Sequence, residues 1–196
     1  MKNQKIKRMV VMALLMAMGV VLQLLSAVIP PVGGFSISLV LLPIVLGAAV
    51  YGIRAGALLG ATFGVVVVIN CITGADAGGA MVFQANPVLC ILVVMGKGIL
   101  AGMASGAVYR LLHKVNPYLA MLVAAIVCPV VNTGVFLLGC LVFFMDTITA
   151  WGTAAGFPSV GAYMIFGLTG ANFLIELGVN LVLSPVCSRL IRIGQR

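Results

Sequence analysis

Two ionisable residues, Lys97 and Glu176, lie inside stretches that are otherwise apolar. At a rise of about 1.5 Å per residue, both lie near the middle of a hydrocarbon core that is about 30 Å thick. A charge at that depth is unfavourable by at least about 2.5 kcal/mol and needs a partner or a water-filled cavity. These residues therefore indicate a functional site inside a membrane-embedded helix bundle.

Amide and hydroxyl side chains recur at the same depth. Asn132 and Thr133 lie near the middle of one apolar stretch. One polar stripe on the last stretch contains residues at helical spacing, namely Thr169, Asn172, Glu176 and Asn180. A lysine near amides suits a carboxylate substrate that also bears hydroxyl or amide groups. The predicted substrate-binding residues are Asn86, Lys97, Asn132, Thr133, Asn172 and Glu176.

Opposite charges at matched depth can also pair with each other. A Lys97–Glu176 salt bridge, held by nearby asparagines, would fix the register of two helices. The sequence leaves the pocket and the bridge open as alternatives, and both can hold at once.

Residues for catalysis and for metal binding are sparse. His113 is the only histidine, and it lies eight residues from Ser105 on one predicted helix, which makes a poor nucleophile–base pair. There is no HExxH motif for zinc, and the five cysteines have no CxxC spacing. We therefore predict no catalytic residue, no metal and no cofactor, and we interpret the cysteines as small buried hydrophobes.

The composition is that of an all-α integral membrane protein. Hydrophobic residues make up 63% of the 196 and charged residues 7%, and the mean hydropathy is +1.30. A soluble domain of this size cannot bury so much apolar surface. The net charge of +8 comes from cations near helix ends, which is typical of topology signals and not of a nucleic-acid-binding surface. We expect contact with lipid and no binding to nucleic acid.

Six apolar stretches predict six membrane spans in a single domain, residues 1–196. The first follows a basic leader, and the absence of a clear small-residue cleavage site favours an uncleaved span over a signal peptide. Pro43 and Pro129 predict a kink or break in the second and fifth spans, while Asn86 and Pro87 predict the start of the fourth. The spans cover about 9–29, 37–53, 55–73, 87–112, 118–145 and 161–188.

The charges orient these spans. Every Lys and Arg except Lys97 falls on one side of the predicted bundle, whereas the connections at 30–36, 74–86 and 146–160 contain none. Those connections hold Asp76 and Asp146. The positive-inside rule then places both termini of this multi-pass protein in the cytoplasm and these loops outside.

The whole chain resembles the substrate-binding S component of an energy-coupling factor (ECF) transporter, the prokaryotic vitamin uptake system. Ala13-Leu-Leu-Met-Ala17 is similar to the family's AxxxA docking motif, and the proline-containing segment 38–64 resembles the second and third spans. Segments 85–112, 131–139 and 170–180 are similar to the last three spans. The chain departs from the family at Lys97, near which many members have an arginine.

The resemblance implies a capture subunit that works with a coupling transmembrane subunit and two ATPase subunits, with Ala13 and Ala17 as the docking surface. The chain itself has no GxxxxGK[ST] phosphate loop, so we do not expect it to be an enzyme. Pantothenate is the first expected substrate, and folate-like carboxylates are second. The alternatives are a self-contained channel or secondary carrier for a small anion, against which no inverted repeat is visible, and an intramembrane enzyme.

Overall fold

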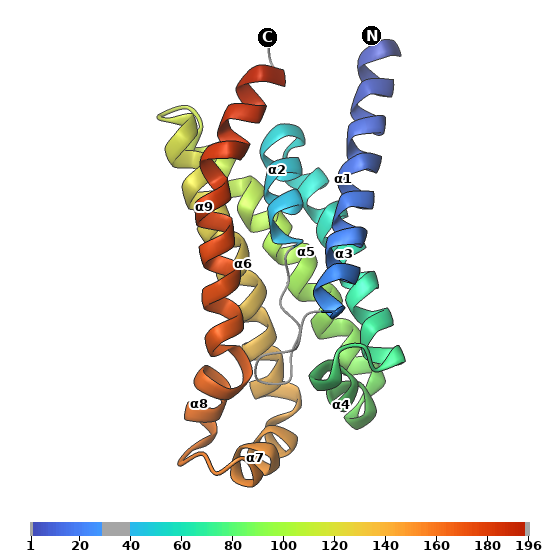
Figure 1. Ribbon diagram of the computed structural model, residues 1–196, viewed down its shortest axis with the longest axis vertical. Coiled ribbons are helices and arrows are strands. Elements are labelled where there is room, and N and C mark those ends of the chain that lie inside the picture. Colours follow the sequence, from blue (N-terminus) through green and yellow to red (C-terminus); the bar gives the residue numbers. More distant parts are fainter. Residues whose placement is uncertain (1, 29–39, 195–196) are drawn as a thin grey trace.

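The chain folds into a bundle of helices, and the computed structural model describes residues 2–28 and 40–194 (Figure 1). No strand occurs in the described ranges. The elements in chain order are α1 (Lys2–Val28), α2 (Leu41–Tyr51), α3 (Ile53–Thr73), α4 (Ala77–Ala85), α5 (Pro87–Leu112), α6 (Pro117–Phe143), α7 (Met145–Ala154), α8 (Val160–Ala162), the π-helix η1 (Tyr163–Thr169) and α9 (Gly170–Gly194).

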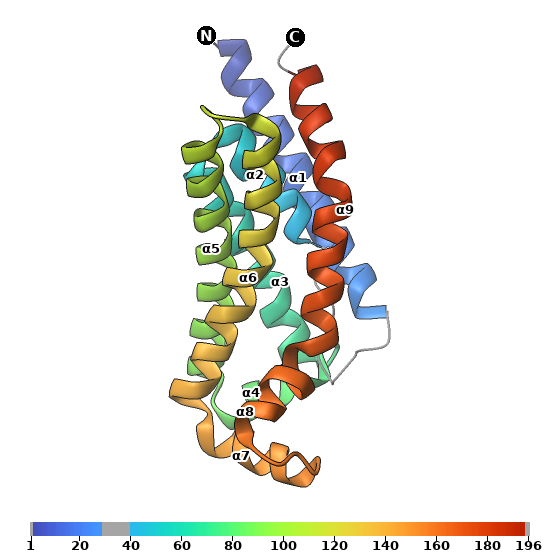
Figure 2. The ribbon, with the colours of Figure 1, turned by 90° about the vertical axis from the view of Figure 1, so that its left-hand side faces the viewer.

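The long helices run along one axis, with α3 against α5, α5 against α6, and α6 against α9. Both chain ends lie at the same end of the bundle, and α4, α7 and α8 lie at the opposite end (Figures 1 and 2). This arrangement agrees with an even number of crossings, but the cytoplasmic position of the termini stays a prediction.

Capping residues fix where two of the long helices begin. The side-chain oxygen of Asn86 accepts a hydrogen bond from the Leu89 N–H at 3.1 Å, and Pro87 follows in the first turn. Asn116 and Pro117 repeat this arrangement at the start of α6. The predicted span 87–112 is confirmed as a helix. Its start could be predicted because Asn86 and Pro87 are typical of a helix N-terminus.

The prediction of six spans is not confirmed. Four described helices are long and apolar enough to cross a membrane, namely those at Gln4–Ser26, Ile53–Thr73, Pro87–Leu112 and Pro117–Phe143. A fifth crossing is formed if Val160–Thr169 and Asn172–Arg189, which meet at 46°, count as one bent span.

The remaining predicted span, 37–53, is represented by α2, which has 11 residues and is about 16 Å long. It cannot cross the hydrocarbon core by itself. Pro43 lies in its first turn, where the missing N–H breaks no helical bond, so the expected break is a helix start. Part of this predicted span, and the predicted loop at 30–36, lie outside the described residues.

Two further expectations were wrong, and one segment has a structure that was not predicted. The predicted outer loops contain the helices α4 and α7, which bury Val82 and Ile148 respectively against the end of the bundle. Pro129 does not interrupt α6, which continues past it with the ring buried. The basic leader is helical from Lys2 onward and simply extends α1.

Glycines allow α3 and α5 to cross at very close range. A methyl group built on Gly60 would overlap the carbonyl oxygen of Gly98, and one built on Gly56 would overlap that of Gly102. The two glycine ladders therefore pack against each other, as small residues do between membrane helices. This crossing fixes the backbone next to Lys97.

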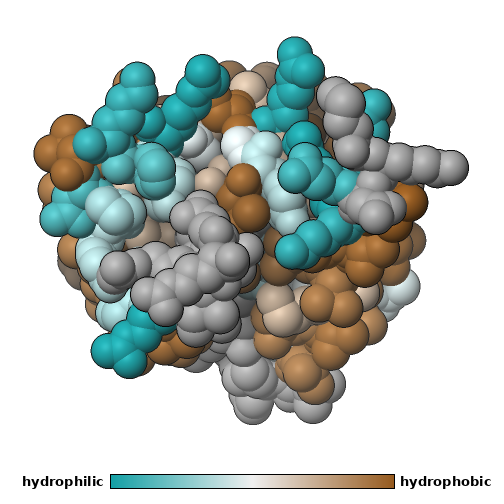
Figure 3. All heavy atoms as spheres, turned by 90° about the horizontal axis from the view of Figure 1, so that it is seen from above, coloured by the Kyte–Doolittle hydropathy of each residue, from teal (hydrophilic) through white to brown (hydrophobic). Residues whose placement is uncertain are grey.

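Hydrophilic side chains gather at the end of the bundle that carries the termini, next to hydrophobic ones (Figure 3). The Arg8 guanidinium donates a hydrogen bond to the Tyr51 carbonyl oxygen at 3.4 Å and lies 5.5 Å from the centroid of the Tyr51 ring. This contact ties α1 to the end of α2. It also places the cation where the positive-inside pattern expects it.

Candidate ligand-binding cavity

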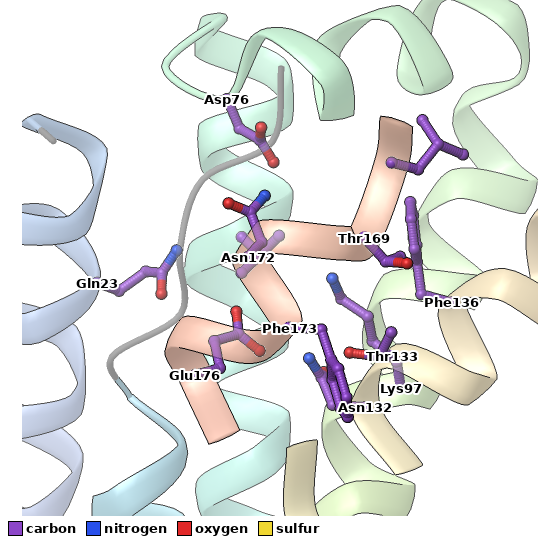
Figure 4. Close-up of a pocket in the computed structure, with 12 residues that line it drawn as sticks. Gln23, Asp76, Lys97, Asn132, Thr133, Phe136, Thr169, Asn172, Phe173 and Glu176 are labelled. Atoms are coloured by element: carbon purple, nitrogen blue, oxygen red, sulfur yellow. The ribbon is translucent and has the colours of Figure 1, made fainter. Parts of the chain in front are cut away.

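A cavity of about 520 Å³ lies between α1, α3, α5, α6, η1 and α9 (Figure 4). This volume includes space at the open mouth of the cavity. Its described lining is mainly polar and comprises Gln23, Val67, Asp76, Lys97, Asn132, Thr133, Phe136, Leu168, Thr169, Asn172, Phe173 and Glu176.

Five of the six residues predicted to bind substrate line this cavity. Lys97 reaches it from α5, Asn132 and Thr133 from α6, and Asn172 and Glu176 from α9 (Figure 4). Helical spacing places Asn172 and Glu176 on one face of α9. The similar depth predicted for the five residues agrees with their meeting in one cavity. The structure thus gathers these side chains, while their contact with a substrate stays a prediction.

Asn86 is the exception, because it is not among the described lining residues. Its side chain caps α5 through the hydrogen bond to Leu89. An N-cap side chain is held at the helix end by the backbone N–H that it accepts. We therefore assign Asn86 the structural role of capping α5. Its role in substrate binding stays a prediction.

The sequence reasoning missed Gln23, Asp76 and Thr169 as members of this lining. Gln23 was detectable, since it is an isolated amide within an apolar stretch. Asp76 was placed in an outer loop, but the chain folds back after α3, with the Asp76 N–H donating to the Asn70 carbonyl oxygen at 3.2 Å. That turn leaves Asp76 8% exposed and directs it toward the cavity (Figure 4).

The π-helix η1 brings Leu168 and Thr169 to the cavity. A π-helix widens the backbone turn, and such segments are frequent at functional sites. The Thr169 hydroxyl donates to the carbonyl oxygens of Met164 at 3.0 Å and Ile165 at 3.2 Å, within that widened turn. The Tyr163 ring packs against Phe157 with the centroids 5.3 Å apart.

The half-buried Lys97 lies over an aromatic ring. Its Nζ is 5.0 Å from the centroid of Phe136 and 6.0 Å from that of Phe63. The first distance is within cation–π range and the second is at its limit. The Lys97–Glu176 bridge stays a prediction alongside this contact.

Two buried acceptors at the cavity lack a hydrogen-bond partner. Gln23 is 2% exposed and Asn132 is 4% exposed, and neither Gln23 Oε1 nor Asn132 Oδ1 accepts a hydrogen bond. A buried polar atom left in this state is unfavourable by about 1–3 kcal/mol. The cavity can therefore bind a molecule that supplies donors.

A second, smaller cavity of about 350 Å³ adjoins the first. The two share Val67, Asp76, Lys97 and Phe136. The rest of its described lining is apolar, small or thiol, namely Cys71, Gly79, Val82, Cys90, Val93, Val94, Cys140 and Phe144. Within the described ranges, no group of three His, Cys, Asp or Glu side chains can hold a metal ion.

The chain matches a known protein family. Residues 7–188 match the family model described as "ECF transporter, substrate-specific component". The matched range contains every described residue that lines the two cavities. No curated protein matches the chain.

Proposed function

Because the chain belongs to the family of substrate-specific components of ECF transporters, we propose that it captures a vitamin or related micronutrient for import. Members of this family bind substrate for transport and are not enzymes. The apolar helices and the family together make this a multi-pass membrane protein. We assign it to a prokaryotic plasma membrane.

The polar cavity is the observation that carries this proposal. A bundle with an apolar outer surface has no structural need for eight polar side chains around one internal space, and buried polar groups are costly unless they are satisfied. We propose that Lys97, Asn132, Thr133, Asn172 and Glu176 contact the substrate. Pantothenate and folate-like carboxylates are candidates to be assayed, and the choice between substrate classes is argued in the next subsection.

We propose that a coupling transmembrane subunit and two ATPase subunits supply the energy. Ala13 and Ala17 are both exposed and lie one turn apart on α1. Their small side chains allow another helix to approach closely. The contact between Arg8 and Tyr51 holds this part of α1 against α2 and so supports a preformed docking surface.

We further propose that residues 1–196 form one membrane domain with both termini in the cytoplasm. The shared position of the two chain ends supports this orientation (Figure 1). The absence of Lys and Arg from the connections at 74–86 and 146–160 supports it as well.

The test separates docking from binding. Ala13→Trp and Ala17→Trp should lower uptake in cells that hold the complete transporter by at least about tenfold, because a bulky side chain blocks a close helix crossing. Substrate retained by the isolated subunit should stay within about twofold of the parent protein, because the cavity is formed elsewhere. The matched control is Leu138→Trp, at a 62% exposed position on α6.

Two results would contradict the proposal. Loss of binding in the isolated Ala13→Trp subunit would assign the alanines to internal packing. Uptake that continues without any ATPase subunit would instead identify a self-contained channel or carrier.

A further inference from the structure

We infer that the substrate has a polar end rich in N–H and O–H donors, without negative charge, joined to a compact apolar part. The inference rests on the proposed function, because it names the substrate class of the same cavity. It follows from the charges, the acceptors and the shape of the two adjoining cavities.

The charge of the lining does not favour an anion. Two carboxyl groups, Asp76 and Glu176, face the larger cavity together with one ammonium group, Lys97, among the described lining residues. Residues 29–39, outside the described ranges, contain no charged side chain. One positive and two negative groups give a formal charge of −1, or 0 if one carboxyl group is protonated. A carboxylate substrate would add repulsion, so Lys97 alone is not a reason to expect pantothenate or a folate.

The acceptor oxygens of the cavity lining favour a substrate that donates hydrogen bonds. Gln23 Oε1 and Asn132 Oδ1 are buried acceptors without a partner, and an ionised carboxylate can only accept. A substrate with hydroxyl, amide or ammonium groups would satisfy both orphan oxygens and bond the carboxylates with charge assistance. Such a substrate would offset the cost of burying these two oxygens without a partner.

The aromatic groups do not favour a quaternary ammonium. Phe136 and Phe173 are the aromatic side chains of the described lining, and the Phe136 ring already lies against Lys97 Nζ, 5.0 Å away. A quaternary cation needs several free ring faces, and it donates no N–H hydrogen bond. The polar end is therefore an amine, an amide or a polyol.

The smaller cavity accommodates the apolar part. Apart from Asp76 and Lys97, its walls are apolar side chains, Gly79 and the buried thiols of Cys71, Cys90 and Cys140. The four residues shared with the larger cavity make the two spaces neighbours. The apolar surroundings suit a compact apolar group that adjoins the polar end of the substrate.

The experiment begins with whatever the protein retains. We would purify the intact chain in detergent from cells grown in vitamin-replete medium, extract small molecules and identify them by mass spectrometry. The expected molecule is neutral or singly positive at pH 7, with several N–H or O–H groups and an apolar ring or alkyl part. A retained carboxylate or phosphate would overturn this inference and leave the proposed function standing.

Equilibrium dialysis with defined probes complements the extraction. Pantothenol and pantothenate share one skeleton and differ in a terminal hydroxyl or carboxylate, and pyridoxamine adds an ammonium group on an aromatic ring. We expect any pantothenol binding to exceed pantothenate binding by at least about tenfold, and the reverse order would overturn the inference. A chain that retains nothing and binds none of these probes would overturn the proposed function, and the inference with it.

Charge-neutral variants then test the carboxylates. Asp76→Asn and Glu176→Gln should each lower retention of the identified molecule by at least about tenfold, because a charge-assisted hydrogen bond is lost. Asp146→Asn, at an exposed position on α7, is the matched control and should retain it fully. Undiminished retention by both Asp76→Asn and Glu176→Gln would overturn the inference.

Discussion

Replacing Gly60 with alanine should force α3 and α5 apart. The added methyl group would overlap the Gly98 carbonyl oxygen and lie 2.6 Å from the Gly98 carbonyl carbon and 3.1 Å from the Ile99 nitrogen, whereas ordinary contacts begin at 3.4 Å. The obstacle is backbone, which cannot rotate away as a side chain can. The helices must therefore separate by about 1 Å, and overpacking of this kind is unfavourable by about 1–3 kcal/mol.

We expect the upper end of that range, about 3 kcal/mol, which corresponds to roughly a hundredfold change in the folding equilibrium. Unfolding in SDS-titrated detergent micelles measures this difference. Retention of substrate should fall as well, because Lys97 lies directly beside Gly98 on the displaced helix. Both quantities are read from the same purified protein.

Gly96→Ala is the matched control for this prediction. It introduces the same methyl group on α5, where nothing lies within 4 Å. Each variant also gains about 0.8–1 kcal/mol of helix propensity, so that effect cancels in the comparison. If Gly60→Ala unfolds at the same midpoint as Gly96→Ala, then α3 and α5 do not cross at these glycines.

Two further predictions concern the lysine and the topology. Lys97→Gln removes an ammonium donor that a hydroxyl or amide oxygen of a neutral substrate would accept from, so it should weaken retention of that substrate by at least about tenfold, and adding Glu176→Gln should not restore it. Recovery of both folding and retention in the double variant would assign the lysine to a salt bridge alone. Cysteines introduced at the exposed positions Ala75 and Thr153 should react with an impermeant maleimide on intact cells, while one at Arg110 should not. Labelling at Arg110 would reverse the proposed orientation.

Where a helix end is encoded locally, the sequence was sufficient to predict it. Asn86 and Pro87 defined the start of α5, and Arg110 marked its polar end. The polar stripe that includes Asn172 and Glu176 followed from helical periodicity, because an α-helix repeats its faces every 3.6 residues. Helical periodicity selected Asn172 and Glu176, and predicted depth in the membrane selected Lys97, Asn132 and Thr133, and these five residues line one cavity.

What the sequence did not reveal depends on contacts between distant segments. Asp76 joins the cavity through the turn after α3, which is closed by its bond to Asn70. The helices α4 and α7 are too short to show a clear period, and they gain stability by burying Val82 and Ile148. The π-helix has no local signal either, because its widened turn depends on how it packs against α7 and Phe157.

The close glycine crossing also has a mechanical consequence for the cavity. Lys97 lies on α5, whose backbone is in contact with that of α3. Close-packed backbones resist compression. The opposite wall, which carries Asn172 and Glu176, continues from a π-helix through a 46° bend, where hydrogen bonding departs from the α-helical pattern. The cavity thus has one stiff wall and one compliant wall. We therefore expect a molecule that enters or leaves to displace the wall that carries Asn172 and Glu176 rather than the wall that carries Lys97.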